Sequence, residues 1–206
     1  MDAARDWLKT NQKEVLDQVN LILFKECWDK YAEGNISSWE MEALCFYYHE
    51  HELYNIDKQK YGIVDFNDLP VEPQVEYFFK RNGKDLPIYK TYKIIGTVIS
   101  KNDNKSSVTL LTTTGVVNVK FTRDQYAKYG KQISEKQEDG TKKVVERGWF
   151  KRGTKLMITG FRREDMFVAK TYKSTPTHQI YRITVVNNGL DMDLVHERIN
   201  VEDGEE

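Results

Sequence analysis

The chain has 206 residues, of which 39% are hydrophobic and 31% charged, a composition typical of a globular protein rather than a disordered one. No apolar run approaches the roughly 18 residues that a membrane-spanning helix needs, and the amino-terminal residues lack the layout of a secretory signal. Cys27 and Cys45 are the only cysteines, which argues against a disulfide framework and makes the reducing cytoplasm the expected compartment.

Charge divides the chain into three parts. Residues 1–89 carry a net charge of −7, residues 90–187 a net charge of +12 and residues 188–206 a net charge of −6, although the whole chain carries only −1. We therefore expect a helical segment over 1–89, a nucleic-acid-binding domain over 90–187 and an acidic carboxy-terminal tail over 188–206. The alternative is that the basic part pairs with the acidic parts of the same molecule.

The first of these parts is expected to be mostly helical. Apolar residues recur at helical spacing over 8–31, and Gly34-Asn35 ends that pattern. Ser37-Ser38 is expected to cap a second helix, whose apolar stripe runs to Tyr48. After a loop-rich stretch, two prolines introduce a further short helix expected over 75–80.

From residue 90 the pattern changes to short β-branched and aromatic runs separated by turn residues, which is typical of an all-β barrel. The expected strands cover residues 92–100, 108–113, 116–121, 155–161, 167–172 and 180–186, with a short helix over 124–130. About five strands with a connector after the third are what an OB-fold needs. We therefore predict an α+β protein, in which a helical amino-terminal portion precedes a five-stranded OB-fold barrel.

One segment of the helical part resembles a known family. Residues 39–53 read WEMEALCFYYHEHEL, which is similar to the LEKExLGFYLSGHPL segment of the alpha subunit of bacterial DNA polymerase III, the C-family replicative polymerase. Cys45 and Glu50 stand where that pattern has glycine, and Glu52 stands where it has proline. These differences put the tight turn that follows the family's helix in question, but not the helix.

The sequence that follows also resembles this polymerase family. Residues 115–121, followed by Tyr126 and Tyr129, are similar to the third strand and connector of its OB domain, and residues 153–160 are similar to the fourth strand. The resemblance implies the non-catalytic carboxy-terminal part of a DNA-directed DNA polymerase, or a stand-alone derivative of it, with a role in DNA replication. The family's catalytic palm aspartates have no counterpart here, so this chain alone is not expected to be an enzyme.

The basic barrel combines cations, which attract phosphates, with aromatic rings, on which unpaired bases stack. The residues expected to bind nucleic acid are Lys93, Asn118, Lys120, Trp149, Lys151, Arg152, Arg162, Arg163, Lys170, Tyr172 and Lys173. Some have a structural alternative: Trp149 with Phe150 could plug the end of the barrel, and Arg162-Arg163 could form a solvated turn. Phe121 and Phe161 are expected in the core.

Single-stranded DNA is the expected partner, and a sliding clamp or another replisome subunit is a second candidate. Residues 18–24 resemble short clamp-docking peptides, although we expect the same side chains to serve as core. No cofactor or metal is expected, because His49 and His51 are two residues apart and the cysteines lack metal-site spacing. The alternatives are a free-standing OB protein for single-stranded nucleic acid and a protein-interaction scaffold within a replisome.

Overall fold

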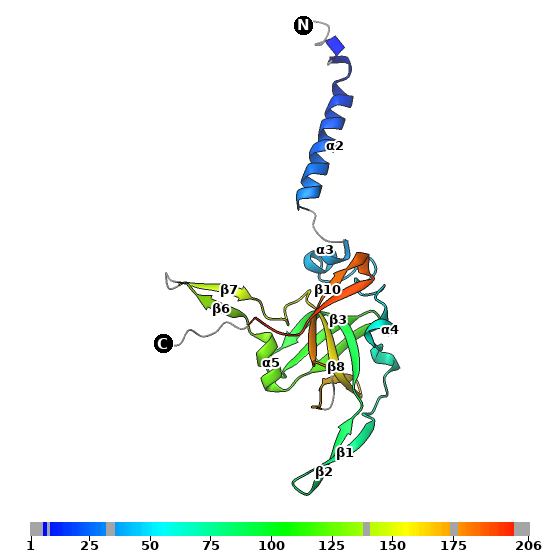
Figure 1. The fold of residues 1–206 in the computed structure, drawn as a ribbon. Helices are drawn as coiled ribbons and strands as arrows, with labels where there is room; N and C mark the ends of the chain where they lie inside the picture. The colour runs from blue at the N-terminus through cyan, green and yellow to red at the C-terminus, as the bar shows by residue number, and fades with distance from the viewer. Residues whose placement is uncertain (1–5, 8, 32–35, 138–140, 174–176, 200–206) are drawn as a thin grey trace.

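A computed structural model describes residues 6–7, 9–31, 36–137, 141–173 and 177–199. Five of its strands close into a barrel (Figure 1), and these are β3 (Tyr92–Asn102), β4 (Ser107–Thr112), β5 (Gly115–Lys120), β8 (Lys155–Arg163) and β9 (Met166–Ala169). The pairing runs β3-β4-β5-β9-β8 and returns to β3, and it is antiparallel except between β5 and β9. Helix α5 (Arg123–Gly130) follows the third barrel strand. The predicted α+β class and OB-fold barrel are confirmed.

The core lies inside this barrel, because alternate residues of each strand point inward. Along β4, for example, Val108, Leu110 and Thr112 are buried, whereas the residues between them are half-buried. Phe121 and Phe161 are buried too, as expected.

Trp149 is also part of this core, so it is not available to stack on a base. Only 1% of its surface is exposed, its ring lies 5.0 Å from that of Tyr129, and its Nε1 donates a 2.7 Å hydrogen bond to Glu146. The prediction that Trp149 contacts nucleic acid is therefore wrong. With the buried Phe150 it closes the end of the barrel, which is the structural alternative.

The chain continues beyond the barrel into a sheet extension. β10 (Ile180–Val186) pairs with β8, and after η2 (Asn187–Gly189) strand β11 (Asp191–Val195) pairs with β10. Residues 191–195, which were expected to lie in an acidic tail, thus form a strand of the sheet. Arg198 then contacts Glu146 at 3.2 Å and donates to the carbonyls of Lys128 and Lys131, each at 2.6 Å. These bonds hold the segment against α5 and the end of strand β7 (Lys142–Glu146).

Residues 75–89 form a β-hairpin, so the prediction of a helix over 75–80 is wrong. β1 (Val75–Arg81) and β2 (Lys84–Tyr89) pair antiparallel around a two-residue turn. Asn82 and Gly83 have φ angles of 50° and 73°, and Asn-Gly favours this turn because both residues tolerate positive φ. A second hairpin, β6 (Ile133–Lys136) and β7 (Lys142–Glu146), occupies part of the connection between β5 and β8.

The amino-terminal part contains α2 (Gln12–Tyr31), α3 (Ile36–Ala43), α4 (Lys58–Tyr61) and the short η1 (Phe66–Asp68). α2 confirms the first predicted helix, and Figure 1 shows it extending away from the barrel. Its Leu21 and Phe24 are 68% and 62% exposed, so the expectation that they belong to the core is wrong. Gly34-Asn35 lies outside the described residues.

Helix α3 ends at Ala43, earlier than the apolar stripe predicted. Ser37 is the second residue of α3 and therefore not its N-cap, and its Oγ donates to the carbonyl of Glu50 at 2.8 Å. Cys45 has a φ of 66°, the left-handed conformation that glycine usually supplies after a helix. Glu40 accepts hydrogen bonds from the backbone amides of Tyr48 and His49, both at 2.9 Å. A tight turn therefore follows the helix even though cysteine replaces the glycine of the polymerase pattern.

Residues 39–53, which resemble the polymerase family and are called the polymerase-like segment, are attached to the barrel at their end by a buried polar cluster. Lys155 of β8 lies 2.7 Å from a carboxylate oxygen of Glu52, and the hydroxyl of Tyr47 donates to the same carboxylate at 3.1 Å. Tyr47 also lies 3.0 Å from the hydroxyl of Thr97 on β3. Burial raises the pKa of Tyr47, so its phenol stays protonated and can donate. Leu53 beside this cluster is fully buried.

The closure of the barrel at Gly160 gives a stability prediction. Gly160 pairs with Tyr92 of β3 and with Ala169 of β9, and an added Cβ would lie 2.1 Å from the carbonyl oxygen of Val168. We expect Gly160→Ala to lower the free energy of unfolding by about 2–3 kcal/mol, because strand β9 must move to relieve the clash. Denaturant unfolding measures this, with Thr184→Ala at an exposed strand position as the control. Equal stability of the two variants would contradict the close approach.

His51 gives a pH prediction. Its Nδ1 accepts from the amide of Leu53 at 3.1 Å and its Nε2 lies 3.0 Å from the carbonyl of Leu111, an arrangement that suits the neutral ring. Burial lowers the pKa of His51. The unfolded chain therefore binds this proton more readily than the folded chain, and stability falls as the pH drops below about 6.5.

We expect His51→Gln to flatten this dependence, because glutamine does not titrate. Denaturant unfolding between pH 7.5 and pH 5 measures the effect, and Thr184→Ala, which removes no titrating group from an exposed position, should keep the wild-type slope. An unchanged slope in His51→Gln would show that other groups cause the acid sensitivity.

Candidate nucleic-acid interface

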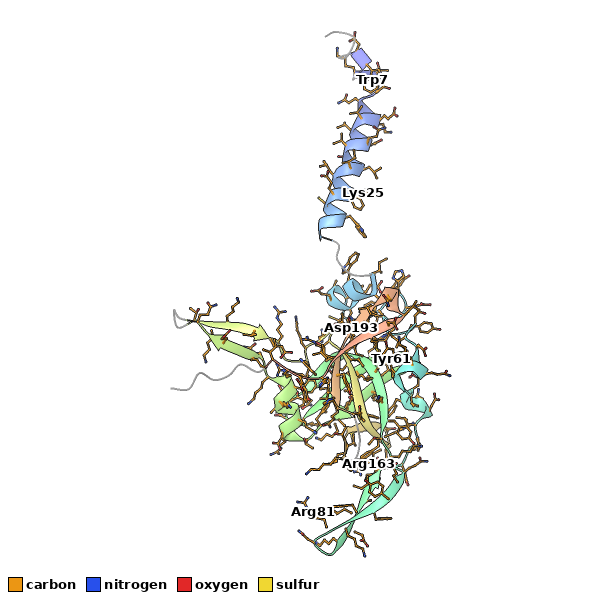
Figure 2. The ribbon with its side chains drawn as sticks, viewed as in Figure 1. Trp7, Lys25, Tyr61, Arg81, Arg163 and Asp193 are labelled. Atoms are coloured by element: carbon orange, nitrogen blue, oxygen red, sulfur yellow. The ribbon has the colours of Figure 1, made fainter. Side chains whose placement is uncertain are left out.

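The candidate site is a groove of about 910 Å³ between the β1–β2 hairpin and the barrel. We call it the hairpin groove. The barrel contributes Phe121, Phe161, Val168 and Ala169, and the hairpin contributes Tyr77, Phe79, Arg81 and residues 86–89. Lys120, Thr122 and residues 170–173 complete the lining. Figure 2 labels Arg163 where the hairpin leaves the barrel and Arg81 on the hairpin itself.

Strand alternation places aromatic side chains along the hairpin wall of the groove. Successive side chains of a strand point to opposite faces, so Tyr77, Phe79 and Arg81 share one face of β1. Ile88 and Leu86 of β2 lie directly opposite Tyr77 and Phe79. Phe79 remains 53% exposed. The wall therefore offers aromatic and aliphatic surface that the protein itself leaves uncovered.

The lining is positively charged. It includes Arg81, Lys120, Lys170 and Lys173, and none of the described residues that line it is acidic. Lys170 lies 5.7 Å above the ring of Tyr172, and Lys120 donates to the carbonyl of Lys105. No ion pair with an acidic side chain is formed by these four cations within the described part of the chain. Their charge remains available to an anionic ligand.

Contacts at the base of the hairpin hold the two walls together. The ring of Tyr89 lies 4.9 Å from that of Phe161, and the amide of Tyr89 donates to the hydroxyl of Tyr172 at 3.2 Å. The amide of Lys90 donates to the carbonyl of Gln74 at 2.9 Å. Burial raises the pKa of Tyr172, so its hydroxyl keeps its proton and can donate to a ligand.

Six of the eleven predicted residues lie in or beside this groove. Lys120, Lys170, Tyr172 and Lys173 line it. Asn118 is two residues before Lys120 on β5, and its Oδ1 accepts from Thr109 at 3.0 Å. Arg163 is exposed at the end of β8, with its guanidinium 5.8 Å from the ring centre of Phe161.

Arg162 has a structural role in this conformation. Its Nη1 donates to the carbonyls of Phe66 and Leu69, both at 3.3 Å, and its Nε donates to the carbonyl of Glu164 at 2.8 Å. The guanidinium also lies 4.5 Å from the ring centre of Phe66. Arg162 thus fastens η1 to the end of β8 rather than presenting its charge to the groove.

The remaining predicted residues lie away from the groove. Lys93 is half-buried and donates to the carbonyl of Tyr61 at 3.4 Å. Lys151 and Arg152 line a different hollow beside Cys45, where Arg152 donates to the carbonyl of Ile99 at 2.9 Å and to the sulfur of Cys45 at 3.0 Å. Like the buried Trp149, these three residues do not lie at the groove.

Sequence reasoning missed the hairpin half of the site. The expected binding residues did not include those of the hairpin, because the prolines at 70 and 73 predict a helix over 75–80. The missed residues are Tyr77, Phe79, Arg81, Leu86 and Tyr89. The available signal was the β-prone aromatic run 77–79 followed by Asn82-Gly83, and an Asn-Gly turn beside such a run is the strongest short-range signal of a hairpin.

Two features are absent from the described residues. None of the helices there is long and apolar enough to cross a membrane. That same part of the chain holds no group of three or more histidine, cysteine or acidic side chains placed to bind a metal ion.

Comparison with known proteins relates the chain to DNA polymerases. No family model matches it, and no solved structure matches it. It is 42% identical over 202 residues, or 98% of its length, to a probable DNA polymerase, YorL, of Bacillus subtilis (strain 168). The same identity and coverage hold for the DNA-directed DNA polymerase of Bacillus phage SPbeta. The chain spans 15% of the length of each of these relatives, so it is similar to one segment of two much longer DNA polymerases.

Proposed function

We propose that the hairpin groove binds single-stranded template DNA, and that the chain is a non-catalytic part of a cytoplasmic replicative DNA polymerase of the polymerase III alpha type. The observation that carries this proposal is a groove lined by four cations, several aromatic rings and no acidic side chain among the described residues. The similarity to a segment of two DNA polymerases supports the replication context. Polymerisation itself belongs to the rest of the longer protein.

The chemistry of the groove suits unpaired DNA without sequence preference. Phosphates meet Lys120, Lys170 and Lys173 along the barrel side, while bases stack against Phe79 on the hairpin side. Stacking on an aromatic ring is tolerant of base identity because every base has a π-face. Duplex DNA does not present its base faces, so the aromatic wall favours single strands.

The exposure of Leu21 and Phe24 on α2 supports a second partner. Both belong to the segment that resembles clamp-docking peptides, and both are accessible where a core role would have buried them. A sliding clamp is therefore the replisome subunit that we propose as a further partner of this chain.

The cations of the groove can be tested by charge reversal. We expect Lys170→Glu/Lys173→Glu to weaken binding of a labelled oligo(dT) and to make log Kd less dependent on log salt, by about 0.7 for each phosphate that is no longer neutralised. Fluorescence anisotropy at several salt concentrations measures both effects. Lys13→Glu/Lys25→Glu on α2 makes the same charge change far from the groove and should bind like the wild type.

These results also test the scaffold alternative. Wild-type protein that shows no salt-dependent binding of oligo(dT) would contradict the proposed function and favour a protein-interaction role. Arg162 is left unchanged in this test because it fastens η1 to the barrel, so its loss would perturb the fold.

The aromatic wall can be tested separately with two neighbouring phenylalanines. We expect Phe79→Ala to weaken oligo(dT) binding by about 1–3 kcal/mol, the contribution of one stacked base. Phe78→Ala is the matched control, since Phe78 does not line the groove and its loss should leave oligo(dT) affinity unchanged. Equal affinities of the two variants would contradict the assignment of Phe79 to the binding wall.

A further inference from the structure

The β1–β2 hairpin has a second face, and the β1 side chains on it lie outside the groove. Phe78 and Lys80 alternate with the groove residues along β1, and neither lines the groove. Phe78 is 63% exposed, more than Phe79 beside it. Aromatic rings that point away from both faces of one ribbon indicate that ligand surface lies on both sides of it.

The base of this ribbon is held firmly, although an isolated two-stranded hairpin is only marginally stable in water. The hydroxyl of Tyr92 donates to Gln74 at 3.1 Å, just before β1, and the amide of Glu164 donates to the carbonyl of Val71 at 2.8 Å. With the Tyr89 contacts described above, these bonds fix the root of the hairpin, while its strands project from the barrel (Figure 1). The hairpin is therefore fixed to the barrel at its base and extends away from it.

The tip of the hairpin carries unbalanced positive charge. Arg81 and Lys84 lie directly opposite each other across the Asn82-Gly83 turn, and like charges in that position destabilise a hairpin. Neither cation forms an ion pair with an acidic side chain among the described residues. A phosphate bound between them would relieve the repulsion, so the tip is suited to the backbone of a nucleic acid.

We propose that the hairpin is a strand-separating pin, and that the chain binds the junction between single-stranded and double-stranded DNA. One strand enters the hairpin groove, and Phe78 on the other face of the ribbon stacks on the last base pair of the duplex. A terminal base pair is the part of a duplex that exposes a full π-face, and the ribbon then lies between the two strands. The inference rests on the proposed function, because the groove must hold the first strand.

The test uses the full chain and two labelled DNAs. One is oligo(dT), and the other is a duplex with a single-stranded dT tail of the same length and a fluorescent base analogue in its last pair. We expect wild-type protein to bind the tailed duplex at least roughly fivefold more tightly than oligo(dT), the lower end of the effect of one stacking contact. Binding should also change the fluorescence of the analogue, because the ring of Phe78 then stacks on the last pair.

Two variants and one control isolate the pin. We expect Phe78→Ala to lose the preference for the tailed duplex and the fluorescence change while keeping the oligo(dT) affinity. Lys84→Glu turns the repulsive pair with Arg81 into an attractive one, so the hairpin remains folded while junction binding weakens. Phe46→Ala removes a phenylalanine of similar exposure after α3 and should behave like the wild type.

The outcomes separate the two proposals. If the protein binds oligo(dT) without any preference for the tailed duplex, the proposal of a strand-separating pin is contradicted, whereas the assignment of the groove still holds. A preference that survives in Phe78→Ala also overturns the pin, because the extra affinity then arises elsewhere. Absence of oligo(dT) binding by the wild type overturns the proposed function and the pin together.

Discussion

Strand β8 is the element on which the rest of the structure depends. It pairs with β3, β9 and β10, and it closes the barrel where Gly160 lets β9 approach more closely than any side chain would allow. The same strand begins at Lys155, which anchors the polymerase-like segment through Glu52. Further along, β8 contributes Phe161 to the groove, and its Arg162 forms the hydrogen bonds that fasten η1 to the barrel. A single strand thus joins the helical part, the barrel and the candidate site.

The residues that carry the resemblance to the polymerase family have structural roles here. Tyr47 and His51 bond to the barrel strands, and Leu53 is buried beside them. Cys45 adopts the left-handed conformation expected of the family's glycine. The segment therefore works as an attachment between the helical part and the barrel. Such a role depends on shape and hydrogen bonding rather than on chemical reactivity.

The candidate interface is shared between the hairpin and the barrel. Residues 75–89 provide the aromatic wall, and residues 120–122, 161 and 168–173 provide the floor and most of the cations. The groove exists only because these separate segments face each other in the folded chain. Much of the excess positive charge of residues 90–187 lies elsewhere, and some of it is used internally, as in the pairs that Arg182 and Lys155 form with buried carboxylates. The position of the candidate site is therefore set by local geometry rather than by the net charge of residues 90–187.

The sequence alone determined the α+β class, the barrel strands and the connector helix, because alternation and turn chemistry are local signals. It also singled out Lys120, Lys170, Tyr172 and Lys173, which project from strands or their ends. It misassigned the hairpin, where the prolines before Val75 outweighed the Asn-Gly turn. Only the tertiary structure decided that Trp149 is buried and Arg162 is occupied by backbone carbonyls, since a side chain's availability depends on which distant segment packs against it. For the same reason, only the folded chain brings the hairpin beside the barrel and creates the groove.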